Sequence, residues 1–192
     1  MNEFRYIIGT TSEVRLGLVF WADKIREYTD TYYQGDKENA RGTDFYGCIS
    51  KLEQISDNIL DKEDFVRSVI DDQNLLASIS IIARTEILIE DEFTPCIEIE
   101  NISNSPWNNI EFPQVEKRKG AATSLVEGII RESRSLGLSD ILKLFAVPEA
   151  QEFYQDLGFE ETDGTGEMIL SSSAASRLLL NLEQKRNSAA FD

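Results

Sequence analysis

The residues with the clearest capacity for chemistry form one short run, Lys117-Arg118-Lys119-Gly120-Ala121-Ala122. Residues 97–102, with the alternation of a strand, precede it, and residues 121–136, with helical spacing, follow it and end at Gly137. The first N–H groups of a helix have no acceptor within the helix, and the helix dipole makes that end positive. A strand, a basic glycine turn and a helix N-terminus in this order are suited to binding a phosphorylated ligand.

A second group of residues offers proton transfer. The chain contains no histidine, so a general base must be a carboxylate, a tyrosine or a water molecule. If residues 96–103 form a strand, alternation places Glu98 and Glu100 on one face, and neighbouring carboxylates are a common source of a general base. The same two side chains are equally consistent with a solvated or salt-bridged strand face.

The overall charge limits the partners of such a site. Aspartate and glutamate outnumber lysine and arginine by 35 to 19, which gives a formal net charge of -16. This charge repels nucleic acid and anionic membrane surfaces, so we expect neither as a partner. A small phosphorylated ligand at the basic turn is still compatible with it, because ordinary salt screens charges beyond about 10 Å.

Length and cysteine usage predict one cytoplasmic domain. With 192 residues, 41% of them hydrophobic, the chain is long enough to bury a single core. Cys48 and Cys96 lack the short spacing of a zinc or redox pair, and we expect two reduced, buried thiols. The N-terminus lacks the basic start and apolar segment of a signal peptide, and no apolar run approaches the roughly 20 residues of a membrane span.

Between the N-terminus and the basic turn, apolar residues recur at helical spacing in two segments, one after Ser12 and one after Thr43. Both Ser12 and Thr43 are suitable N-caps. Strand-like patterns cover residues 4–9, 65–70, 75–84 and 96–103, with a turn at 71–74. In the strand over 75–84 we expect the odd-numbered residues from Leu75 to Ala83 to share one face. Residues 85–94 either extend this meander or form a connecting turn, and residues 103–115, which contain two prolines, are expected as a loop.

Beyond the turn and its helix, residues 141–147 are nearly continuously apolar and predict a strand covered on both faces. Strand, helix and strand together form a βαβ unit. A short helix over residues 149–157, a hairpin around Asp163-Gly164 and a leucine-bearing helix over residues 174–186 complete the pattern.

This order of elements, and the residues at two junctions, resemble the GNAT-type N-acetyltransferase superfamily, well over residues 65–171 and loosely over the N-terminal helices. That family carries the motif Q/R-x-x-G-x-G/A between a strand and a helix, and Lys117, Gly120 and Ala122 occupy the matching positions here. It also carries a tyrosine on a later helix followed by a Gly-Phe pair, which matches the run Phe153-Tyr154-Gln155-Asp156-Leu157-Gly158-Phe159.

The resemblance implies an α+β fold, the acyl-CoA N-acyltransferase (GNAT) fold, with a mixed sheet of about six to seven strands flanked by helices on both faces. It also implies one acetyltransferase domain over residues 1–171 and a C-terminal helical tail over residues 172–192. The chain departs from the family in two respects. Lys117 stands in place of glutamine or arginine and lacks the planar fork of arginine, and the connection before the motif, residues 103–115, is longer. We interpret this connection as a loop over the site that takes part in substrate selection.

By the same resemblance the cofactor is acetyl-CoA, and its residues can be assigned one by one. The matching pyrophosphate-binding positions are Lys117, Arg118, Lys119, Gly120, Ala121, Ala122 and Thr123. The acyl arm is expected along Asn101, Ile102 and Ser103, where backbone N–H groups polarise the thioester carbonyl. Tyr154 is the expected general acid, or alternatively a core aromatic, and Glu98 and Glu100 are the candidates for the base.

The expected activity is acetyl transfer to a primary amine, either of a small cationic molecule or of an exposed protein. The alternatives are a catalytically silent acyl-CoA-binding or regulatory module and, since the family includes them, a toxin-like enzyme acting on charged tRNA, against which the acidic balance argues. Aromatic residues in or near the two N-terminal helices either line an acceptor site for a cation or belong to the core; they are Trp21, Tyr28, Tyr32, Tyr33, Phe45 and Tyr46. A homodimer is also compatible with the sequence.

Overall fold

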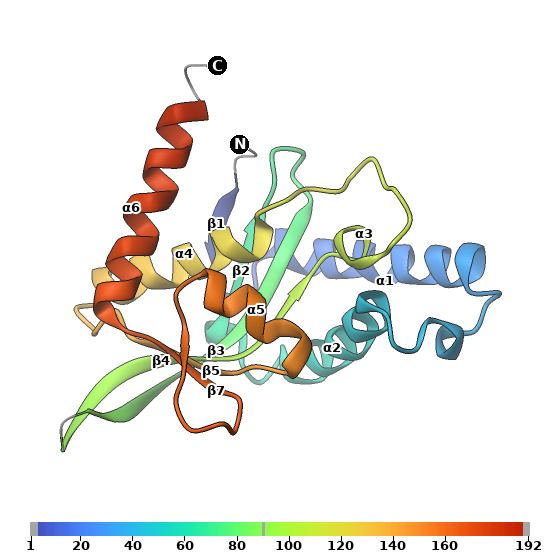
Figure 1. Cartoon of the computed structure of the whole chain (residues 1–192). Coiled ribbons are helices and arrows are strands. Elements are labelled where there is room, and N and C mark those ends of the chain that lie inside the picture. Colours follow the sequence, from blue (N-terminus) through green and yellow to red (C-terminus); the bar gives the residue numbers. More distant parts are fainter. Residues whose placement is uncertain (1–3, 90, 190–192) are drawn as a thin grey trace. The chain divides into compact units, whose positions relative to one another are not determined.

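The computed structural model describes residues 4–89 and 91–189 (Figure 1), and within them seven strands form one mixed sheet in the order β1-β2-β3-β4-β5-β7-β6. The strands are β1 (Arg5–Ile8), β2 (Val66–Ile70), β3 (Leu76–Ile89), β4 (Glu92–Asn104), β5 (Leu142–Phe145), β6 (Glu160–Glu161) and β7 (Glu167–Leu170). The α-helices are α1 (Ser12–Tyr32), α2 (Asp44–Asn58), α3 (Pro106–Asn109), α4 (Ala121–Ser135), α5 (Pro148–Asp156) and α6 (Ser172–Ala189). β4 and β5 are parallel, so the predicted βαβ unit and the mixed sheet are confirmed.

The described residues divide into two compact units. The N-terminal unit comprises residues 4–81 and 101–125, and the C-terminal unit comprises residues 82–100 and 126–189. β3, β4 and α4 each contribute residues to both units.

The N-terminal unit packs α1 and α2 against the antiparallel strands β1, β2 and the first half of β3. Its core buries Trp21, whose indole N–H donates to the carbonyl oxygen of Leu76 at 2.7 Å. Both helices begin at capped ends: Thr43 caps α2 as predicted, whereas Thr11, not Ser12, caps α1 by accepting from the backbone N–H of Val14. Both caps satisfy an N–H group that the helix itself leaves without an acceptor.

β3 differs from the simple alternation expected of it. Val69 pairs with Ser78 but Ile70 pairs with Leu76, so the pairing skips Ala77 and leaves an extra residue in β3. This bulge brings Leu76 into the same core as Ile79 and shows that the odd-numbered residues do not share one face over the whole strand. A one-residue irregularity of this kind leaves no mark on the hydrophobic pattern, because residues 76–82 are buried on both faces.

Regular structure is present in two segments for which the sequence predicted either a loop or no single conformation. Residues 85–94 extend the meander, because β3 continues to Ile89 and β4 begins at Glu92. The segment over residues 103–115 is not a free loop in its first half: it contains the end of β4 and the short helix α3, whose Trp107 is fully buried beside the rings of Phe20 and Trp21. The expectation of a loop over the site is therefore wrong for residues 103–110.

The C-terminal unit pairs β5 with β4 on one side and with β7 on the other, and β6 completes the hairpin with β7. The predicted tail helix is α6, and it packs on this unit through buried apolar residues, namely Ala174, Ala175, Leu178 and Leu179. The buried carboxylate of Glu127 on α4 accepts hydrogen bonds from Arg131, at 2.9 Å, and from Arg186 of α6. Along the described chain, no helix combines the length and apolarity needed to cross a membrane.

Candidate functional site

The basic turn stands where the sequence placed it, directly before α4 in the N-terminal unit. α4 begins at Ala121, and its first backbone hydrogen bond runs from the N–H of Ser124 to the carbonyl of Gly120 at 2.9 Å. Residues 121–123 thus present helix N–H groups that have no acceptor within the helix. Gly120 has φ +94°, a conformation that L residues rarely adopt, while a Cβ there would meet Phe4 only at 3.8 Å. Backbone conformation, not space, therefore requires glycine at this position.

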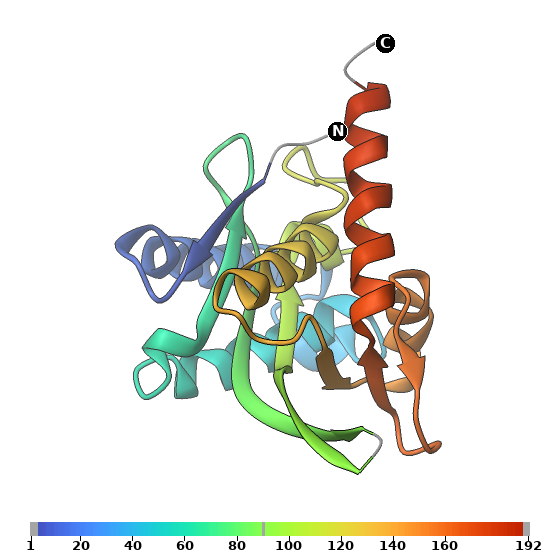
Figure 2. The same ribbon diagram turned by 90° about the vertical axis from the view of Figure 1, so that its left-hand side faces the viewer.

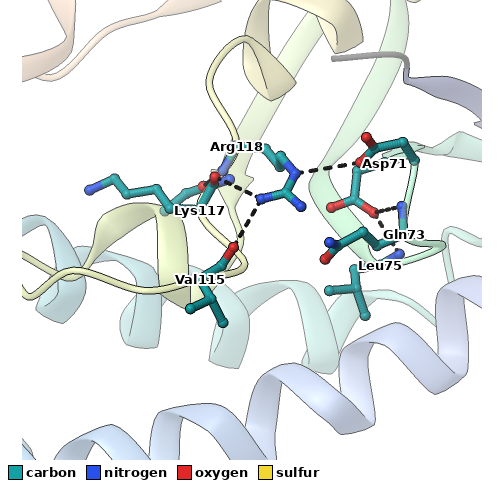
Figure 3. Close-up of polar contacts among 8 residues, drawn as sticks. Asp71, Gln73, Leu75, Val115, Lys117 and Arg118 are labelled. Carbon is teal, nitrogen blue, oxygen red and sulfur yellow. Dashed lines mark hydrogen bonds and ion pairs between the residues drawn. The ribbon is translucent and has the colours of Figure 1, made fainter.

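Arg118 stabilises the turn through hydrogen bonds of its side chain and its backbone (Figure 3). Its guanidinium donates to the carbonyl oxygens of Val115 and Lys117, at 3.0 and 3.1 Å, and to the carboxylate of Asp72 at 3.4 Å. Its backbone N–H donates to the side chain of Asn108 at 2.8 Å. Arg118 therefore holds the shape of the turn, whereas the side chains of Lys117 and Lys119 are exposed.

The partner of Arg118 belongs to an ordered turn between β2 and β3. The carboxylate of Asp71 accepts from the backbone N–H groups of Gln73 and Leu75, both at 2.9 Å (Figure 3). This is the local hydrogen bonding by which aspartate fixes turns. Asp72 is the next residue of this turn, and its carboxylate forms the ion pair with Arg118 of the basic run.

The strand segment expected to carry the acyl arm is held by serine and asparagine side chains. Ser80 donates to the carbonyl of Asn101 at 2.6 Å, and Ser78 donates to the carbonyl of Ser103 at 2.9 Å. The side chain of Asn101 accepts from the backbone N–H of Ile81 at 2.9 Å. β5 pairs with β4 only over Ile97–Ile99, so residues 101–103 follow the end of the parallel ladder. Strand N–H groups beyond such an end are suited to binding an extended ligand.

The three candidates for proton transfer, Glu98, Glu100 and Tyr154, belong to the C-terminal unit. Glu98 forms an ion pair with Lys143 at 3.1 Å across the β4–β5 pair, which is the salt-bridged strand face considered as the alternative. Glu100 is exposed.

Tyr154 is 5% exposed and packs edge-on against Phe153 and Phe159. Burial raises the pKa of Tyr154 to about 12, so its phenol is protonated at neutral pH. It can therefore donate a hydrogen bond, but it is a weaker acid than a free tyrosine.

A cation site that the sequence analysis missed lies on α1. The ammonium of Lys24 is 5.8 Å from the ring centre of Phe20 and 5.5 Å from that of Tyr28. It also forms ion pairs with Glu27 at 3.1 Å and with Glu116 at 3.5 Å. Partial burial alone lowers the pKa of Lys24, but the two carboxylates outweigh it and the net direction is upward. The spacing of four residues from Phe20 to Lys24 and from Lys24 to Tyr28 was the available signal.

Most of the aromatic residues near the N-terminal helices belong to the core, which was one of the two interpretations of the sequence. Trp21, Tyr28 and Phe45 are at most 1% exposed. Tyr32 differs: it is partly exposed and stacks on Phe112 with ring centres 4.1 Å apart. The hydroxyl of Tyr28 is buried without a hydrogen-bond partner among the described residues. Within the described ranges, 4–89 and 91–189, no group of three or more acidic, cysteine or histidine side chains is placed to hold a metal ion.

Comparison with known proteins bears on the fold. No protein-family model and no curated protein matches the chain. Among solved structures, similar ones are a chain of the KacTA–DNA complex (TM-score 0.54, 14% identity, 73% of this chain and 90% of that chain) and AtaT complexed with acetyl-methionyl-tRNAfMet (TM-score 0.52, 10% identity, 68% and 86%). Another is a GCN5-related N-acetyltransferase from Anabaena variabilis (TM-score 0.53, 13% identity), where the likeness covers 83% of this chain but 32% of the other.

At identities this low, the structural similarity shows a shared fold and nothing finer. The chain has the acyl-CoA N-acyltransferase fold of the GCN5-related, or GNAT-type, proteins, as the two junction motifs indicated. The residues of the turn fit the phosphate-bearing end of a coenzyme A ligand, because the turn offers helix N–H groups, a glycine with positive φ and two exposed lysines.

Proposed function

We propose that the protein is an acetyl-CoA-dependent N-acetyltransferase that acylates a primary amine. The observation that carries this proposal is the turn at Gly120, which leads from the segment after α3 into the N-terminus of α4 with a left-handed glycine and cationic neighbours. Acetyl-CoA supplies an acetyl group activated as a thioester. In the proposal, Lys117 and Lys119 attract its phosphates, and the N–H groups of residues 121–123 bind the pyrophosphate.

Arg118 has a different part in the proposal from its neighbours. Its guanidinium is occupied by two carbonyl oxygens and by Asp72, so it shapes the turn rather than pairing first with phosphate. The backbone N–H groups of Asn101, Ile102 and Ser103 are assigned to the acyl arm, where they stabilise negative charge developing on the carbonyl oxygen. The serine and asparagine bonds described above hold that segment of strand in place.

The acceptor we propose is a cationic primary amine, either small or exposed on a protein. The formal charge of -16 supports this, because it attracts cations and repels anions. AtaT and KacTA were solved with tRNA and DNA respectively, but the acidic balance of this chain argues against a nucleic-acid acceptor here.

For the chemical step we propose that the amine nitrogen attacks the thioester carbon, that the carbon–sulfur bond breaks, and that the departing thiolate takes a proton. Tyr154 is the proposed donor, supported by a phenol that is protonated at neutral pH. Glu98 or Glu100 is the proposed acceptor of the ammonium proton.

A specific observation also favours the alternative, a catalytically silent acyl-CoA-binding module. Glu98 has a structural ion pair, and Tyr154 is buried among aromatic rings. Both residues are therefore explained without catalysis. In this alternative the turn binds acetyl-CoA, and no amine is acylated.

Two measurements on the purified chain separate these functions. Calorimetry with acetyl-CoA tests binding, and mass spectrometry of a panel of diamines, amino acids and lysine peptides incubated with acetyl-CoA tests transfer. The proposal predicts binding and an acetylated amine that is absent when the protein is omitted. Binding without any acetylated product supports the silent module, and absence of binding contradicts both.

A further inference from the structure

The hairpin of β3 and β4 continues past the strands that flank it. β2 pairs with β3 only from Leu76 to Ile81, and β5 pairs with β4 only from Ile97 to Ile99. The part of the hairpin between these limits, residues 82–89 and 92–96, is a two-stranded ribbon (Figures 1 and 2). We call this part the ribbon. A two-stranded hairpin without further strands is only marginally stable in water, so the ribbon gains from a partner.

The two edges of the ribbon are not equivalent. On β4 the edge carries Pro95, which has no N–H group, and the carbonyl of Pro95 accepts a hydrogen bond from the hydroxyl of Ser139. On β3 the edge over residues 82–89 contains neither proline nor glycine. Proline is one of the usual means of preventing strand pairing, so of the two edges the β3 edge is the one open to a further strand.

Exposed apolar side chains accompany this open edge. Leu88 is 57% exposed and Ile89 is 39% exposed, near the end of β3. Apolar residues gathered at an open edge mark a surface for association. The charges on the same edge, Arg84 and Glu86, are both exposed, and neither forms an ion pair with another described residue.

We propose that the open edge of β3 pairs antiparallel with the same edge of a second copy of the chain. The sequence of the edge is complementary to itself. With a twofold axis at Thr85, Arg84 of each copy lies opposite Glu86 of the other, and Thr85 lies opposite Thr85. Ile82 then lies opposite Leu88. On the face of the even-numbered residues, an apolar side chain therefore lies opposite an apolar one and a positive charge opposite a negative one. Such cross-strand pairs are the unit of sheet stabilisation.

The charges also select this register. Moving the pairing by two residues in one direction places Arg84 opposite Arg84, and moving it in the other places Glu86 opposite Glu86. Like charges directly opposite one another are destabilising, so both shifted registers are disfavoured. The net charge of -16 on each copy opposes association at long range, but at about 0.15 M salt the Debye length is about 8 Å and short cross-strand pairs dominate.

Charge reversal on this edge gives a test specific to a twofold pairing. Arg84→Glu or Glu86→Arg alone places like charges opposite one another at two points of the interface. We expect each to raise the dimer dissociation constant about tenfold or more. The double variant Arg84→Glu/Glu86→Arg restores opposite charges and should dimerise like the natural chain. An equimolar mixture of the two single variants should also dimerise, because each supplies the charges that the other lacks.

The readout is molar mass by light scattering and sedimentation velocity at about 0.15 M salt. Circular dichroism of each variant shows that it is folded, and Arg26→Glu, the same charge change on an exposed face of α1, is the matched control and should leave the dimer intact. A monomeric natural chain, or a dimer that neither single variant weakens, would overturn the proposal. So would failure of both the double variant and the mixture to restore association in folded protein. None of these results depends on acetyl transfer.

Discussion

At the scale of single residues, the environment of Tyr154 decides what its hydroxyl can do. Burial between two aromatic rings raises its pKa from 10.0 to about 12, because the anionic phenolate is poorly solvated there. The hydroxyl is therefore a permanent hydrogen-bond donor at neutral pH. In the proposed reaction this hydroxyl supplies the proton that the departing thiolate takes.

This shift has a measurable consequence for stability. Between pH 10 and 12 the folded state keeps the proton that the unfolded state releases, so the contribution of Tyr154 is fully present below pH 10 and is lost as pH rises through about 12. The contribution is on the order of 2–3 kcal/mol. We expect the free energy of unfolding of Tyr154→Phe to fall less than that of the natural chain over this range, as measured by urea denaturation at several pH values. Equal slopes for the two proteins would contradict the shift.

At the scale of elements, α3 anchors the connection between β4 and the basic turn. Trp107 is fully buried, packs on the rings of Phe20 and Trp21, and leaves its indole N–H without a partner among the described residues. Because the sequence of this segment is rich in proline and asparagine, its pattern predicts a loop. Its burial depends on contacts with α1, which lies far away in sequence.

Substitution of Trp107 tests whether α3 is part of the core. Trp107→Ala should lower the free energy of unfolding by about 3–5 kcal/mol, because it removes a fully buried ring and leaves a cavity. Trp107→Phe keeps an aromatic ring and removes the unpartnered N–H, so it should cost clearly less than the alanine variant. Urea denaturation of both variants measures the difference. A loss below about 1 kcal/mol for Trp107→Ala would show that the segment is not anchored as described.

At the scale of the whole molecule, much of the fold could be predicted from the sequence. Strand and helix periods, the cap at Thr43 and the glycines at 120 and 158, both with positive φ, indicated most elements and both motif junctions. The β3 bulge, the burial of Trp107 and the cation site at Lys24 were not predicted, and the salt-bridged face at Glu98 was predicted only as one of two alternatives. The burial of Trp107 and the partner of Glu98 depend on side chains from separate elements, and the bulge depends on strand pairing; local periodicity encodes neither.

The assignment of residues 1–171 as the acetyltransferase domain and 172–192 as a tail is still a proposal, as is residence in the cytoplasm. α6 packs on the C-terminal unit through buried alanine and leucine residues. Residues 190–192 of the proposed tail lie outside the described part of the chain. Both cysteines are buried free thiols, as expected.

The central claim is that the turn at Gly120 binds acetyl-CoA, and a matched pair of glycine substitutions tests it most directly. Gly120 and Gly137 stand at opposite ends of α4, both have positive φ, and a Cβ at either position meets nothing closer than 3.8 Å. Alanine at either should therefore cost a similar amount of stability, about 1–2 kcal/mol. Calorimetry with acetyl-CoA should show binding to the natural chain, unchanged affinity in Gly137→Ala and roughly tenfold or weaker affinity in Gly120→Ala, because only the latter distorts the N–H groups assigned to the pyrophosphate. Absence of binding to the natural chain, or equal affinity in the two variants, would contradict the account.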